Sequence, residues 1–214
     1  MERKGTRMID RGLKIINLRI PVDKDYMYGV LTKPSNCKGI VLLCMGSRVN
    51  RHKIHNTYLQ NSLVENGYAT LSMDLLTPIE EESYDKRFSL DLNTNRMLFV
   101  IRWIRDYEIT ENLPISVMGI DNGALIFLEA SLKSENLIAN LILRNEDILD
   151  IISEKGAIKL PKTLVVFILE RESEINIKLD SIDTKMIKAE FIPETNVSLD
   201  EDSSFTDIVI EFLG

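Results

Sequence analysis

The chain has 214 residues, a formal net charge of −7, 44% hydrophobic residues and 28% charged residues. This composition is typical of a globular protein and excludes a disordered or fibrous one. Because the basic residues are scattered among acidic ones, the sequence also lacks the concentrated positive charge with which proteins bind nucleic acid.

Targeting and cofactor signals are absent from the sequence. The first ten residues are rich in charge and are not followed by the apolar run of a signal peptide, and no stretch has the length that spans a bilayer. Cys37 and Cys44 are too few for a disulfide framework or a zinc site. No Pro/Gly/Ser-rich linker divides the chain. We therefore expect residues 1–214 to form a single cytoplasmic domain without a metal, a cofactor or a membrane contact.

The predicted elements begin with an antiparallel hairpin. Residues 13–20 and 27–31 have strand-like patterns, and the Asp-rich residues 22–25 between them have the chemistry of a turn. Residues 39–45, GIVLLCM, are apolar without alternation. Such a run is typical of a strand covered by helices on both faces, so we expect a central strand here.

Helices and strands are then predicted to alternate. An amphipathic helix around residues 97–104 is expected to be capped by Thr94. The pattern predicts a mostly parallel sheet of about eight strands with helices on both faces, whose site lies beyond the carboxyl ends of the strands. The other predicted helices are 58–64, 123–132, 147–152 and 205–213, and the other predicted strands are 68–73, 115–118, 137–143, 163–169 and 186–192.

One predicted connection is long, from about Leu75 to Leu90, and it contains the acidic run Glu80–Glu82. Connections of this length in compact domains are often lids or binding segments. A solvated acidic surface loop would have the same composition. Both interpretations stay open at this point.

The most informative motif is Gly119-Ile120-Asp121-Asn122-Gly123, which lies between a predicted strand and a predicted helix. A nucleophile elbow, G-x-S-x-G, requires this context, because its sharp turn leaves room only for small residues two positions before and after the nucleophile. Here Asp121 takes the place of the serine. Alternatively, Asp121 caps the helix through its carboxylate, since any glycine-bounded turn before a helix can have this pattern.

The chain from about Leu13 to Phe212 resembles the dienelactone-hydrolase-like α/β hydrolases, including small members associated with phosphoribosyltransferase domains. The resemblance implies the α/β-hydrolase fold. It also implies an oxyanion hole formed by amides of the Gly46-Ser47 loop and of Asn122. The segments that carry it are Met45-Gly46-Ser47, Arg51-His52, Asn56-Thr57-Tyr58-Leu59, Gly67-Tyr68-Ala69-Thr70-Leu71, Asp74-Leu75-Leu76-Thr77-Pro78 and Arg87-Phe88.

The family's catalytic triad is altered in this sequence. By resemblance, the acid maps to Glu170 or Glu172, and the histidine maps to Asn196. No histidine follows His55, and a serine hydrolase needs an imidazole to move the proton of its nucleophile. Met45 also replaces a histidine of the family's oxyanion loop. The usual triad is therefore absent.

Asp121 could still act as a nucleophile, because a carboxylate can form an alkyl ester that water then hydrolyses. The second step needs a base, and Asn196 cannot supply one. His52 is a candidate substitute base, whereas the alternative is that Arg51 and His52 hold the loop before the helix near Asn56.

Three functions are compatible with these residues. The first is a degenerate hydrolase, catalytically weak or inactive, that is retained for binding a small molecule or a protein. The second is a hydrolase of non-standard chemistry for an ester, epoxide or related substrate, in which a buried Asp121 is nucleophile or general base assisted by His52 or Glu172. The third, implied by the resemblance, is a domain that docks on a phosphoribosyltransferase.

Overall fold

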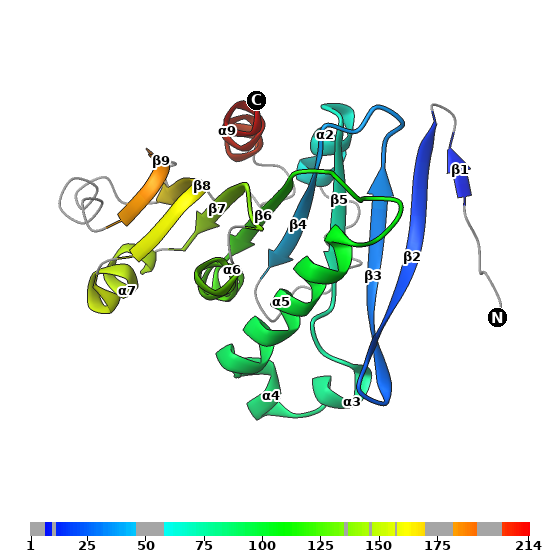
Figure 1. The fold of residues 1–214 in the computed structure, drawn as a ribbon, viewed down its shortest axis with the longest axis horizontal. Coiled ribbons are helices and arrows are strands. Elements are labelled where there is room, and N and C mark those ends of the chain that lie inside the picture. Colours follow the sequence, from blue (N-terminus) through cyan, green and yellow to red (C-terminus); the bar gives the residue numbers. More distant parts are fainter. Residues whose placement is uncertain are drawn as a thin grey trace.

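The computed structural model describes residues 7–9, 12–45, 58–134, 137–145, 147–156, 158–169, 182–191 and 203–214. Within these residues, nine strands form one sheet in the order β1-β2-β3-β5-β4-β6-β7-β8-β9 (Figure 1). The strands are β1 (Arg7–Ile9), β2 (Leu13–Val22), β3 (Asp25–Lys33), β4 (Gly39–Met45), β5 (Tyr68–Met73), β6 (Ile115–Ile120), β7 (Asn140–Arg144), β8 (Ile158–Leu169) and β9 (Ile182–Phe191).

The predicted architecture is confirmed. The opening hairpin pairs β2 with β3 from Lys14↔Lys33 to Val22↔Asp25, and β3 is also antiparallel to β5. All neighbours from β5 through β9 are parallel. The additional strand relative to the predicted eight is β1, which extends the hairpin edge by pairing Arg7 with Ile15.

Helices cover both faces of the sheet, as the apolar pattern of β4 requires. Ile40 and Leu42 face one core with helices α5, α6 and α7, whereas Val41 and Leu43 face a second core with α2 and α9. None of the described helices combines the length and apolar character needed to cross a membrane. The helices are α2 (Tyr58–Glu65), α3 (Pro78–Glu81), α4 (Tyr84–Phe88), α5 (Leu90–Arg105), α6 (Asn122–Lys133), α7 (Ile148–Lys155) and α9 (Ser203–Leu213).

The prediction that Thr94 caps α5 is wrong. The helix begins at Leu90, and its N-cap is Ser89, whose side chain accepts a hydrogen bond from the Leu92 N–H at 3.3 Å. Thr94 lies one turn inside the helix and is buried. Ser89 is in the extended conformation that a cap requires, whereas Thr94 belongs to the core-facing side of α5.

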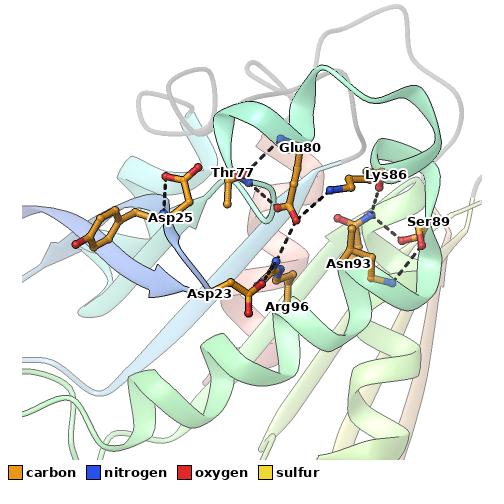
Figure 2. Close-up of polar contacts among 10 residues, drawn as sticks. Asp23, Asp25, Thr77, Glu80, Lys86, Ser89, Asn93 and Arg96 are labelled. Carbon is orange, nitrogen blue, oxygen red and sulfur yellow. Dashed lines mark hydrogen bonds and ion pairs between the residues drawn. The ribbon is translucent and has the colours of Figure 1, made fainter.

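The long connection between β5 and α5 contains the two short helices α3 and α4. Thr77 and Glu80 form a capping box at the start of α3. The Asn93 side-chain amide lies at the end of α4 and donates to the carbonyls of Lys86, Arg87 and Ser89 at 3.3, 3.3 and 2.8 Å (Figure 2). The connection is therefore tied to α5 by specific bonds.

The acidic run Glu80–Glu82 is divided between two environments. Glu80 is largely shielded and forms an ion pair with Arg96 of α5, which also reaches Asp23 in the β2–β3 turn (Figure 2). Glu81 and Glu82 are exposed. A uniformly solvated acidic loop is thus wrong for Glu80, because this carboxylate joins the connection to the helix and to the hairpin.

The strand order reverses direction between the parallel neighbours β4 and β6. The chain continues from β4 to β5 on one side and from β6 to β7 on the other, so the connections after these neighbouring strands diverge. Ligands bind in open α/β sheets at such a switch point. The connection after β6 begins with Asp121, and the connection after β4 lies outside the described residues.

Candidate functional site

Asp121 alone forms the turn between β6 and α6. Its φ of 53° and ψ of −125° lie outside the regions that residues with side chains ordinarily adopt. The Asp121 N–H donates to the Arg144 carbonyl at 2.9 Å. Its own carbonyl accepts from the Ala124 N–H at 3.0 Å and from the Asn145 side-chain amide at 3.1 Å. The strained turn is therefore fixed on both sides of its Cα.

Gly119 and Gly123 make this turn possible. A Cβ on Gly119 would lie 2.4 Å from the Gly123 carbonyl oxygen, and a Cβ on Gly123 would lie 2.2 Å from the Cys44 carbonyl oxygen. Both distances are impossible for real atoms, so only glycine fits at either position. The spacing that indicated an elbow in the sequence thus corresponds to backbone contacts on both sides of Asp121.

The Asp121 side chain does not cap α6. It makes no hydrogen bond to the first turn of the helix, because capping requires the extended conformation and Asp121 has a positive φ. The prediction of a buried Asp121 is also wrong, because its side chain is exposed. Among the described residues, its carboxylate has no hydrogen-bond or ion-pair partner. The elbow therefore presents a charged side chain to solvent.

Asn122 is the first residue of α6. The first N–H groups of a helix have no acceptor within the helix, so this is a position from which an amide can bind an oxyanion. Its role in an oxyanion hole stays a prediction.

The other predicted site residues lie outside the part of the chain that the structure describes: Gly46, Ser47, His52, Glu170, Glu172 and Asn196. The strands that precede them are described. Since β4, β6, β8 and β9 are parallel, their carboxyl ends share one edge of the sheet. The connections that contain these residues therefore start at the same edge as Asp121, and the roles of the residues stay predictions.

Arg144 and Asn145 lie directly beside the elbow, and no pattern in the sequence had predicted them as site residues. Arg144 ends β7, and its guanidinium carbon lies 5.2 Å from the centre of the Phe205 ring. The Asn145 side-chain oxygen accepts from the Asp147 N–H at 2.8 Å. An Asn two residues before an Asp, after an apolar strand, is a recognisable turn signal. It did not reveal the bond to Asp121.

Cys44 at the end of β4 is not an alternative nucleophile. It lies against Gly123 of the elbow, and burial raises the pKa of its thiol to about 12. The reactive form of cysteine is the thiolate, which is scarce at neutral pH under these conditions. Within the described residues, no group of three His, Cys, Asp or Glu side chains is arranged to hold a metal ion.

Comparison with known sequences gives a partial match. No family model matches the chain. Two proteins from Mycobacterium tuberculosis, of strains CDC 1551 / Oshkosh and ATCC 25618 / H37Rv, are each 38% identical over 96 residues, or 45% of this chain. Their names give phosphoribosyl transferase as a provisional assignment. The match covers 22% of each relative's length.

Comparison with solved structures covers nearly the whole chain. A dienelactone hydrolase from Anabaena variabilis ATCC 29413 has a TM-score of 0.75 and 23% identity, over 94% of this chain and 95% of that chain. A cold-adapted esterase from an Arctic intertidal metagenomic library gives 0.67 and 14%, over 99% of both chains. The Pyrococcus furiosus esterase Pf2001 gives 0.64 and 14%, over 95% and 93%. Since these identities are low, the likeness establishes the fold alone: the chain has the α/β-hydrolase fold of dienelactone hydrolases and esterases.

Proposed function

We propose that the chain is a degenerate α/β hydrolase that binds a small molecule or a protein and has little or no catalytic turnover. The observation that carries the proposal is the exposed Asp121 carboxylate at a fully formed elbow. An elbow of this shape serves to present one side chain. Here that side chain lacks the hydroxyl of a serine nucleophile, and both histidines of the chain precede residue 56.

Retention of the elbow favours a binding role over simple decay. A residue in a sparsely populated conformation costs on the order of 1–3 kcal/mol and persists only where its surroundings enforce it. Gly119, Gly123 and the bonds from Arg144 and Asn145 do so around Asp121. An exposed carboxylate held in this way favours a ligand with a positively charged or hydrogen-bond-donating group.

The first test is hydrolysis of a short-chain p-nitrophenyl ester by the wild type, Asp121→Ala and Asp85→Ala at matched concentration, with a buffer blank. Asp85 is an exposed carboxylate on α4 and serves as the matched control. We expect no turnover above the blank from any of the three. Turnover that Asp121→Ala abolishes and Asp85→Ala preserves would overturn the proposal.

Binding is tested separately with benzylamine, benzyl alcohol and benzoate, which differ mainly in the charge of one group. In NMR titrations, the wild type should bind benzylamine most tightly, benzyl alcohol less tightly and benzoate most weakly. The reason is that the Asp121 carboxylate attracts the ammonium group and repels the benzoate. Asp121→Asn keeps the shape and removes the charge, so it should abolish the order. Equal binding of the amine by both proteins would exclude Asp121 as the recognising group.

A second candidate function is hydrolysis through an Asp121 ester, and the exposed position of the carboxylate favours it. A carboxylate oxygen would attack a carbon of an epoxide or haloalkane while the C–O or C–halogen bond breaks, and water activated by a base would then cleave the ester. Incubation with styrene oxide and peptide mass analysis should find an adduct on Asp121 that Asp121→Asn lacks. No adduct with epoxides, haloalkanes or activated esters would exclude this chemistry.

We also propose that the chain acts in the cytoplasm with a phosphoribosyltransferase-type partner. The support is the 96-residue match to two much longer proteins with that provisional name. Affinity purification of the tagged chain from its own cells, followed by mass spectrometry, should enrich such a protein. Good recovery of the chain without one would contradict the proposal.

A further inference from the structure

Asn145 connects two elements through the two ends of its side chain. Its amide nitrogen donates to the Asp121 carbonyl at 3.1 Å, and its amide oxygen accepts from the Asp147 N–H at 2.8 Å. The Asn145 carbonyl also accepts from the Ile148 N–H at 3.4 Å, where α7 begins. One residue thus shapes the turn that starts α7 and holds the backbone of the elbow.

The bond to Asp121 acts at the point where the elbow is strained. The ψ of −125° at Asp121 sets the direction of its carbonyl, and the Asn145 amide binds that carbonyl from outside α6. On the other side of the same residue, the Asp121 N–H donates to the Arg144 carbonyl, and this is the last hydrogen bond between the β6 and β7 segments. Without the Asn145 bond, the Asp121 carbonyl would keep only the bond from the Ala124 N–H. The ψ angle of Asp121 could then relax towards a less strained value.

We propose that Asn145 is a positioning residue that fixes the side chain at position 121, so that the turn between β7 and α7 sets the reactivity of the group the elbow presents. The inference concerns the geometry of the elbow and holds whether or not the native chain catalyses a reaction. It therefore stands or falls separately from the proposed binding function.

A cysteine at position 121 makes this geometry measurable. In Asp121→Cys the thiol sits at the N-terminus of α6, where the helix dipole and free N–H groups lower a thiol pKa below its ordinary value of about 8.5. The rate of alkylation by iodoacetamide, followed against pH by peptide mass analysis, gives the pKa at this position. The wild type gives the background from Cys37 and Cys44.

Two substitutions in this background separate the elbow from the turn. Asn145→Ser is neutral and keeps a hydroxyl that can accept from the Asp147 N–H, but it is too short to reach the Asp121 carbonyl. Asn145→Ala removes both bonds. Thr77→Ala, which breaks the capping box of the remote helix α3, controls for general loss of stability.

We expect both Asn145 variants to raise the thiol pKa and to slow alkylation several-fold at neutral pH, with Thr77→Ala unchanged. Because Asn145→Ser preserves the start of α7, a purely structural role would leave its pH profile like that of the parent. That result would overturn the proposal, as would a parent thiol that titrates like free cysteine. Thermal unfolding of each variant confirms that the rates come from folded protein.

Discussion

The guanidinium of Arg96 lies 3.1 Å from Oε1 of Glu80, and the two side chains are only 12% and 13% exposed. The same guanidinium lies 3.3 Å from Asp23. The pair therefore joins three separate segments: the connection after β5, helix α5 and the β2–β3 hairpin (Figure 2).

Glu80→Gln should lower the free energy of unfolding by an amount between the roughly 1 kcal/mol of exposed ion pairs and the roughly 3 kcal/mol of buried ones. This substitution leaves the shielded Arg96 guanidinium beside a neutral amide in place of a carboxylate. Lys86→Ala is the control, since Lys86 is 49% exposed and 3.7 Å from Glu80. Urea unfolding at neutral pH measures both, and equal small effects would show that the Glu80–Arg96 pair does not stabilise the fold.

The Glu80 contribution should depend on pH. Burial raises the pKa of Glu80, but the hydrogen bond from the Thr77 N–H and the charge and hydrogen bond of Arg96 together outweigh it, so the pKa lies below its ordinary value of 4.5. A lowered pKa stabilises the folded state above that ordinary value, and the stabilisation is lost as pH falls through the folded pKa. The stability difference between the wild type and Glu80→Gln should shrink below about pH 5; a constant difference would contradict this linkage.

Gly123→Ala should lower the free energy of unfolding by about 3 kcal/mol or more, which is the upper end of the cost of overpacking a core. The added methyl would meet the Cys44 carbonyl oxygen at 2.2 Å, so β4 and α6 would have to separate. Gly156→Ala is the control, because it adds the same methyl group where no atom lies within 4 Å. Its strain comes only from the φ of +79° at Gly156 and should cost about 1 kcal/mol. Denaturant unfolding measures the stability of both variants, and equal losses in the two would show that the elbow tolerates a Cβ.

Cys44 should resist alkylation in the folded protein and react only on unfolding. Burial raises the pKa of its thiol from 9.0 to about 12. Because the unfolded chain ionises first, this difference should also lower the free energy of unfolding as pH rises from 9.0 towards 12. Site-resolved mass analysis with iodoacetamide, with and without urea, checks the first expectation. Labelling of Cys44 in the native state would indicate local opening at the elbow.

Tyr68→Phe should lower the free energy of unfolding by about 1 kcal/mol. The Tyr68 hydroxyl donates to the Leu213 carbonyl at 2.7 Å, and phenylalanine keeps the ring that packs in the core. The loss should appear as faster hydrogen exchange near the end of α9. Tyr26→Phe, on an exposed ring, should change neither quantity. Unchanged exchange in Tyr68→Phe would mean that packing alone holds the helix.

Apolar runs predicted the fold well. The predicted bounds of strands 39–45 and 68–73 agree with β4 and β5. For β4 the reason is its uninterrupted apolar run, which a strand buried on both faces requires, whereas β5 also contains the buried polar residues Thr70 and Ser72. Strand β1 escaped prediction because Arg7–Ile9 is too short for a pattern. Residue type alone indicates Thr94 as a cap, but it cannot distinguish a buried threonine from a capping one.

The candidate site was predictable only in part. Two glycines and their spacing predicted the elbow, since the close backbone contacts at Gly119 and Gly123 admit no other residue. Nothing in the sequence indicated that Asn145, 24 residues further along, binds the Asp121 carbonyl. That contact depends on the pairing of β6 with β7, which brings distant residues together and leaves no local pattern.

The packing of α9 has a consequence for how the chain is made. Phe205, Val209 and Phe212 cover Val41, Leu43, Met118 and Ile142 on one face of the sheet. During synthesis, the strands that carry those apolar side chains leave the ribosome long before residues 203–213. Helix α2 can cover part of this face early, but the part that α9 covers stays exposed until residues 203–213 have been made. A nascent chain at that stage is expected to bind chaperones that recognise exposed apolar surface.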